Sequence, residues 1–268
     1  MGNGIQPYAA AFKVQFKNQL AYRTDIILDM ILTMLSSLIF VFVWVAAYSF
    51  SGTTSLDGLS LTLMIAYFVM VGAIRQITGW PQIINNMEDD IKQGGIARFM
   101  IRPMSYTMQL FLEALPVNIL FFVFGSIPVI VLVIVFGHFV VSYQLIAIFV
   151  VEMLIAYFMI NLIGFMIGSM AVYLSSVWGI ANGVAEVFSI AGGAIVPLAF
   201  LSQGVANTLM LTPFPFMYYI PAGTLLGIIP MSTALQSVAV GIAWVAVLAV
   251  LAHFVWGRVK RDINAVGG

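Results

Sequence analysis

Long apolar stretches alternate with short polar ones along the chain, and this pattern predicts a series of helices that cross a membrane. A helix needs about 20 predominantly apolar residues to span the hydrocarbon core of a bilayer. Six stretches meet this requirement. The predicted spans cover residues 26–50, 59–78, 109–136, 144–174, 177–201 and 234–256.

A shorter amphipathic pattern precedes the first span. Phe12, Phe16 and Leu20 recur every four residues, and two lysines lie off that stripe. An apolar stripe flanked by basic residues is typical of a helix that lies in the headgroup plane. We therefore expect an interfacial helix over residues 5–23. A signal peptide is not expected, because the short apolar core and the small-residue cleavage site are both missing.

Residues 202–232 are apolar but contain four prolines. Proline removes a backbone donor, and broken backbone at membrane depth needs protein or water around it. We expect a re-entrant segment or an outer helical cap between the fifth and sixth spans. The alternative interpretation is a kinked seventh span.

The basic residues predict the orientation. All ten precede the first span, lie at or within the connection between spans two and three, or follow the sixth span. They are Lys13, Lys17, Arg23, Arg75, Lys92, Arg98, Arg102, Arg258, Lys260 and Arg261. The positive-inside rule makes that side the cytoplasm and places both termini there. A full crossing by residues 202–232 would reverse the sixth span and break this agreement.

Composition narrows the class of protein further. Hydrophobic residues make up 62% of the 268 residues and charged residues only 7%, with a mean hydropathy of +1.09. A soluble domain is about one quarter charged, so soluble enzymes, nucleic-acid binders and disordered proteins are excluded. The fold class expected is an all-α polytopic membrane protein. We expect residues 1–268 to form a single transmembrane domain.

Candidate catalytic chemistry is missing from the sequence. The chain has no cysteine and two histidines, His138 and His253, which lie near opposite ends of the predicted topology. A P-loop, a His-Glu-x-x-His zinc motif and a Gly-x-Ser-x-Gly motif are all absent. We therefore expect a chain that is not an enzyme and that holds no cofactor or metal.

Residues 82–105 form the one long polar connection. The acids Glu88, Asp89 and Asp90 are expected to begin a helix, because negative charge suits a helix N-terminus. Two glycines follow, and residues 96–103 are basic and amphipathic. An acidic cluster followed by a basic anchor suits docking onto a cytoplasmic partner. The alternative is an ordinary solvated loop with snorkelling arginines.

The run Glu-Asp-Asp-Ile-Lys-Gln-Gly-Gly-Ile-Ala-Arg-Phe-Met-Ile-Arg-Pro-Met-Ser-Tyr over residues 88–106 resembles the signature of type-2 ABC exporter permeases. Residues 21–25 and 213–227 are similar to two other segments of that family, and the resemblance covers nearly the whole chain. Gly95, Met100 and Met104 depart from the usual pattern.

The resemblance implies the transmembrane subunit of an ATP-driven exporter in a prokaryotic plasma membrane. Two separate ATPase subunits would bind ATP and Mg, and a second six-span permease, a different chain in preference to a copy, would complete the path. The substrate implied is an amphipathic compound, a drug or a lipid-like molecule moving outward. The resemblance assigns contact with the ATPase to Glu88, Asp89, Asp90, Ile91 and Gln93.

Polar residues inside spans are costly and mark candidate functional positions. In span five, Gly179, Asn182, Glu186, Ser189 and Gly193 share one helical face. A second stripe lies in span one. If both faces meet across a dimer, the translocation path is lined by Asp29, Thr33, Ser36, Asn182, Glu186 and Ser189. Tight helix packing by small residues is the alternative.

Other polar and small residues in the spans are expected to have structural roles. Gly164, Gly168 and Asn161 in span four are expected to serve helix packing. Glu113 and Glu152 lie nearer helix ends and are expected at the interface. Two rival functions stay open: an ion-coupled secondary transporter with a proton site at Glu186 or Asp29, and a non-transporting membrane scaffold. A secondary transporter usually shows internal repeats, and none is clear.

Overall fold

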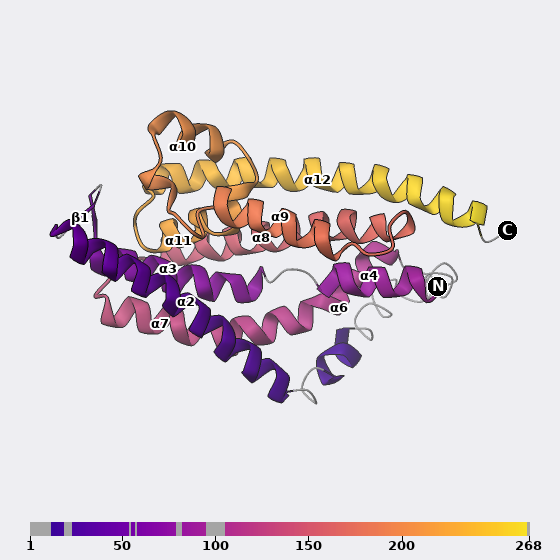
Figure 1. Ribbon diagram of the computed structural model, residues 1–268, viewed down its shortest axis with the longest axis horizontal. Coiled ribbons are helices and arrows are strands. Elements are labelled where there is room, and N and C mark those ends of the chain that lie inside the picture. Colours follow the sequence, from indigo (N-terminus) through magenta and orange to yellow (C-terminus); the bar gives the residue numbers. More distant parts are fainter. Residues whose placement is uncertain are drawn as a thin grey trace.

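The computed structural model describes residues 12–18, 23–53, 55–56, 58–78, 82–94 and 105–266, and most of them are helical (Figure 1). The helices are α2 (Arg23–Ser51), α3 (Leu61–Ile77), α4 (Gln82–Lys92), α6 (Tyr106–Leu120), α7 (Ile127–Phe136), α8 (Tyr143–Ser169), α9 (Trp178–Ala191), α10 (Gln203–Met210), α11 (Tyr219–Leu225) and α12 (Met231–Val266). Shorter elements are the π-helix η1 (Phe121–Ser126), the 3-10 turns η2 (Met170–Val172), η3 (Leu198–Phe200) and η4 (Phe214–Met217), and the antiparallel strands β1 (Ser55–Leu56) and β2 (Leu59–Ser60).

The lengths and compositions of the helices are those of a polytopic all-α membrane protein. Among the described residues, three helical stretches are long and apolar enough to cross a membrane: Tyr106–Phe136, Tyr143–Val172 and Met231–Ile263. Two shorter apolar helices, Leu38–Ser51 and Leu61–Gln76, accompany them. These five stretches overlap five of the six predicted spans.

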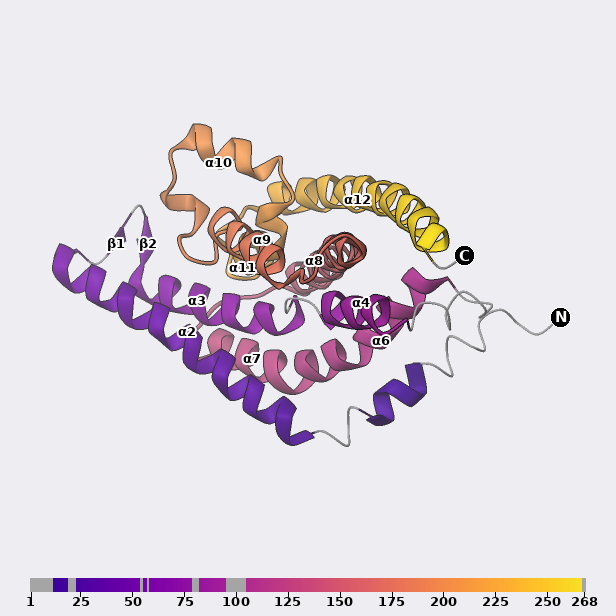
Figure 2. The same ribbon diagram turned by 45° about the vertical axis from the view of Figure 1, so that its right-hand side comes forward.

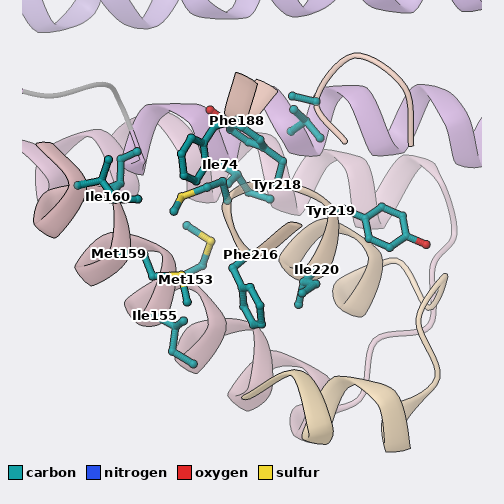
Figure 3. Close-up of a cluster of buried hydrophobic side chains, with 14 of the residues drawn as sticks. Ile74, Met153, Ile155, Met159, Ile160, Phe188, Phe216, Tyr218, Tyr219 and Ile220 are labelled. Atoms are coloured by element: carbon teal, nitrogen blue, oxygen red, sulfur yellow. The ribbon is translucent and has the colours of Figure 1, made fainter. Parts of the chain in front are cut away.

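Helix α8 is the centre of the bundle. Two thirds of its most apolar window (67%) is buried, against 22% and 17% for the other two long stretches. It packs against α12, against α4 near Gly168 at its C-terminal end and against α11 near Glu152 in its first half. Figure 3 shows Met153, Ile155 and Met159 of this helix in one cluster of buried side chains with Phe216 and Ile220, which follow α10 in the sequence.

The third predicted span is one rod made of α6, η1 and α7 (Figure 1). Pro128 lies at the start of α7 and cannot donate a hydrogen bond to the preceding turn. The backbone widens to a π-helix just before it. In this turn the buried Ser126 hydroxyl donates a hydrogen bond of 2.7 Å to the carbonyl of Ala73 in α3. The irregular turn therefore joins the rod to α3.

The fifth predicted span, 177–201, is too long. Helix α9 ends at Ala191, because Gly192 and Gly193 follow it and Gly193 adopts a left-handed conformation with φ of 85°. A side chain at Gly193 would strike Tyr67, whose hydroxyl donates 2.7 Å to the Gly193 carbonyl. Hydropathy does not register this turn, since the residues beyond it are also apolar.

Residues 202–232 contain no helix long enough to span a membrane. Helix α10 has 8 residues, η4 has 4 and α11 has 7. None of the residues of α10 is buried, whereas every residue of α11 is buried. The segment is therefore not one regular helix: α10 lies on the surface and α11 is inserted in the bundle. The re-entrant segment or outer cap, and its alternative of a kinked seventh span, stay predictions.

The structure also gives the helix bounds at two other predicted segments. The sixth span was expected over 234–256, but α12 continues as a helix to Val266, beyond the basic cluster. Of the interfacial helix predicted over 5–23, residues 12–18 are helical, and the rings of Phe12 and Phe16 stack 6.0 Å apart. The rest of that segment, apart from the start of α2 at Arg23, lies outside the described residues.

Candidate functional site

Helix α4 lies in the predicted polar connection and packs one face on the end of α8. Its apolar residues Ile83, Ile84 and Met87 are buried. The opposing position on α8 is Gly168, where an added Cβ would lie 3.0 Å from Cβ of Met87 and 3.3 Å from Cα of Ile84. The absence of a side chain at Gly168 thus brings the two helices together, which confirms its expected packing role.

The five residues predicted to contact an ATPase lie on the second half of α4 and just beyond it. Asp89 and Gln93 are exposed, and Glu88 is half-buried and forms an ion pair with Lys92 one turn later. Ile91 is half-buried and packs against the hydrophobic core. Of these five residues, Asp89 and Gln93 are therefore the two that a partner could reach fully, with Glu88 beside them.

The acids do not begin the helix as expected. Helix α4 starts at Gln82 and has no acidic residue in its first turn. A favourable charge at a helix N-terminus contributes only about 0.3–1 kcal/mol. Burial of one large apolar side chain contributes about 1.5–3 kcal/mol, and α4 buries three. Packing on α8 therefore sets the position of the helix.

Asp90 is engaged within the chain. Tyr106, the first residue of α6, donates a hydrogen bond of 2.9 Å to Oδ2 of Asp90. The Tyr106 ring also stacks on Trp256 of α12, with 5.1 Å between centroids, and Trp256 meets Phe165 of α8 at 5.4 Å. These contacts tie α4 to three other helices.

Sequence reasoning missed the contribution of Tyr106. It is the last residue of the polar motif at 88–106, and that position was the available signal. Residues 95–104 of the same motif, including Arg98 and Arg102, lie outside the described residues. At the same end of the bundle, the Tyr173 hydroxyl donates a hydrogen bond to Oδ2 of Asp262 near the end of α12.

The polar stripe predicted on span five is divided. Asn182 and Glu186 are exposed on α9, and the Asn182 amide donates 2.9 Å to the carbonyl of Trp178. Ser189 is buried and accepts a hydrogen bond of 2.9 Å from Nη2 of Arg75 in α3. The structure therefore leaves two of these three residues available to a partner and turns the third into the bundle.

The predicted stripe on span one lies on α2, but the side chains of Asp29, Thr33 and Ser36 are outside the described part of the structure. In both views α3 lies between α2 and α9 (Figures 1 and 2). Within one chain, helix α3 therefore separates α2 from α9.

Arg75 is a second residue that sequence reasoning undervalued. The sequence analysis used Arg75 only to predict the orientation in the membrane, although this residue lies within a predicted span. An arginine at such a position needs a polar partner. In the structure it is half-buried, bonds Ser189 and lies over the Tyr218 ring, 5.3 Å from Cζ to the centroid. Its position inside an apolar stretch was the signal.

Glu152 is not at the interface as expected. Its side chain is fully buried in α8, and its Oε1 accepts a hydrogen bond of 2.9 Å from Oγ1 of Thr224 in α11. The sequence predicted an interfacial position because Glu152 lies in the first half of its span. The inserted helix α11 covers that half of α8, which no local pattern indicates.

The cavity at the α10 end of the bundle is small. It has a volume of about 230 Å³ and is lined by α10, η3 and the junction of α11 with α12, with Gln203, Asn207, Tyr219 and Thr233 among its residues. Pockets that enclose drug-sized ligands measure about 300–1,000 Å³.

Comparison with known proteins identifies the family. The family model described as ABC-2 family transporter protein matches residues 32–267. No curated protein and no solved structure matches the chain.

Proposed function

The chain belongs to the ABC-2 family of transporter proteins, and on this premise we propose that it is the six-span transmembrane subunit of an ATP-driven exporter. Its sequence has no nucleotide-binding P-loop, so the energy must come from ABC ATPase partners that carry ATP and Mg. The six spans are α2, α3, the α6–α7 rod, α8, α9 and α12. Helix α9, with 14 residues, is only about 21 Å long. The segment that follows it, through α11, would cover the rest of the membrane thickness.

The observation that carries this proposal is the construction of α4. Its apolar face is held on α8 by Ile83, Ile84 and Met87, while Asp89 and Gln93 remain exposed. We place this end of the bundle in the cytoplasm, together with both termini, in agreement with the positive-inside rule. Closure of the ATPase pair would push on α4, and α8 would carry the displacement across the membrane.

The path for the substrate would form between two permeases. Asn182 and Glu186 are exposed on α9, and an acidic side chain facing lipid is costly. We propose that this face meets a second six-span permease, in a heterodimer in preference to a homodimer, and lines the route with Asp29, Thr33 and Ser36 of α2. An anionic Glu186 would favour cationic amphipathic or lipid-like substrates moving outward.

A cross-linking experiment tests the coupling surface. Because the chain contains no cysteine, a single Gln93→Cys substitution gives one reactive thiol at an exposed position just beyond the end of α4. We expect a short thiol-reactive cross-linker in native membranes to join it to an ABC ATPase, identified by mass spectrometry. The matched control is Asn207→Cys, exposed on α10 at the opposite end of the bundle, which should give no such product.

Two results would contradict the proposal. Cross-linking to an ATPase from the α10 control but not from α4 would reverse the orientation. Uphill transport by liposomes that contain this chain alone would show that no ATPase is required, and would favour an ion-coupled transporter instead.

A further inference from the structure

A carboxyl group is enclosed where α8 meets α11. Glu152 and Thr224 each have an exposed fraction of 0%. Oγ1 of Thr224 donates to Oε1 of Glu152 over 2.9 Å. The two residues are 72 positions apart in the sequence, so this bond joins the central helix to the inserted segment.

The second oxygen of this carboxyl group has no hydrogen-bond partner. Of the buried side-chain nitrogen and oxygen atoms in the described part of the chain, Oε2 of Glu152 alone lacks one. Buried polar groups are nearly always hydrogen-bonded, so an exception requires a physical explanation. An ionised carboxylate here would be far costlier than the neutral acid, because a single neutral hydroxyl is its partner.

Helices α3, α9 and α11 bring no positive charge to this carboxyl group through any described hydrogen bond or ion pair. The titratable residue of α11 is Tyr219, whose ring lies 6.3 Å from that of Tyr67 on α3. Arg75, also on α3, is bonded to Ser189. Glu186 of α9 is exposed and would in any case add negative charge.

The charged parts of α12 and α4 lie far along the bundle. A Cβ on Gly241 would lie 2.8 Å from Cγ2 of Ile155, which sets the first turns of α12 beside Glu152. The titratable residues of α12 begin at His253, about 18 Å beyond Gly241 along the helix axis. Helix α4, with all its charges, packs near Gly168, about 24 Å from Glu152 along α8.

A proton is the ligand that satisfies these observations, because it needs no cavity and removes the charge. We propose that Glu152 is a proton-binding site, in which Oε2 carries the proton and Oε1 accepts the hydrogen bond from Thr224. The neutral pair then holds α11 on α8. If the two helices separate, water reaches the carboxyl group, and a solvated glutamic acid is ionised at neutral pH.

The site links proton release to movement of α11. This consequence for transport rests on the proposed function, whereas the bound proton does not. Each opening at the α11 end would release one proton to the water on that side, and closing would take one up. Higher pH on that side would therefore favour the open state.

Infrared spectroscopy of the full-length protein in lipid at neutral pH tests the site directly. We expect the carbonyl band of a protonated carboxyl group, which Glu152→Gln removes. Thr224→Val, which deletes the donor to Oε1, should move the band to higher frequency. The matched control is Glu88→Gln, whose carboxylate is ion-paired with Lys92 and which should leave the band unchanged.

Two kinds of infrared spectrum would overturn the proposal. A spectrum with no such band, or a band that persists in Glu152→Gln, would show that Glu152 is ionised and would overturn the proposal. A band that Glu152→Gln removes but Thr224→Val does not move would overturn the neutral pair. If Glu152→Gln failed to fold, the shift in Thr224→Val would still decide. Neither variant is tested by transport, so failure here leaves the exporter proposal intact.

Discussion

The two ends of α8 hold their neighbours by different means. At one end α4 packs Met87 and Ile84 against the bare backbone of Gly168. At the other end α11 is joined to α8 by the buried hydrogen bond between Thr224 and Glu152. The contact of α4 with α8 is apolar packing, whereas the contact of α11 with α8 includes a group that can gain or lose a proton. We infer a permanent joint at the α4 end and a releasable one at the α11 end.

The difference suits a helix that transmits movement. Helix α8 is 27 residues long, has no proline and is buried over most of its length. In the proposed mechanism α4 stays attached, so a push on α4 would move α8 as a rigid body. Because ionisation of Glu152 would break the opposite contact, the same movement would free α11 without unfolding the bundle. Three substitutions test this contrast.

The largest effect is expected for Gly168→Leu. Its side chain would meet Met87 and the backbone of Ile84, and overpacking of this kind costs about 1–3 kcal/mol. We expect α4 to leave α8 and the yield of ATPase co-purified with the chain to fall at least tenfold, while α8 stays helical by circular dichroism. Gly257→Leu on α12, where nothing lies within 4 Å, is the control. Unchanged ATPase association would show that the joint does not depend on close approach.

A smaller effect is expected for Thr224→Val. The substitution removes the hydrogen bond to Oε1 of Glu152. Loss of a partner by a buried acceptor costs about 1–3 kcal/mol. We expect a lower midpoint of thermal unfolding and normal ATPase association. Thr208→Val is the matched control, because Thr208 is exposed and bonds only within α10, to the carbonyl of Gly204 at 2.8 Å. Equal midpoints for the two variants would argue against a stabilising pair at the α11 end.

The smallest effect is expected for Lys92→Gln. It removes the ion pair with Glu88 on α4, and such pairs one turn apart contribute about 0.2–0.5 kcal/mol. We expect the thermal midpoint to stay close to wild type at both low and high salt. A large, salt-dependent loss would mean that charge, not apolar packing, holds α4, and the contrast between the two ends would fail.

Much of the fold could be predicted because hydrophobic runs are local. The runs at 26–50, 59–78, 109–136 and 144–174 correspond to α2, α3, the α6–α7 rod and α8 with η2. Every backbone group in lipid must be bonded within the chain, so a long apolar run in this composition forms a helix. The prediction was wrong where an apolar run contains a turn, as at Gly193, because hydropathy is blind to backbone conformation.

The candidate site was less predictable. The sequence marked the correct segment for α4 but placed its start wrongly, because the decisive contact is with Gly168, some 80 residues away. It treated Arg75 as a marker of orientation and Ser189 as part of a path, and the structure bonds them to each other. Roles that depend on a partner distant in the sequence leave no periodic signal.

Two acidic residues show where each kind of information ends. Both Glu152 and Glu186 are visible in the sequence as costly charges inside apolar runs. Composition and hydropathy alone decide that the chain is a helical membrane protein, because the transfer of each segment into lipid is a sum over its own residues. Only tertiary packing decides that Glu152 is enclosed by α11 and that Glu186 faces outward, because enclosure requires a second segment brought close by the fold.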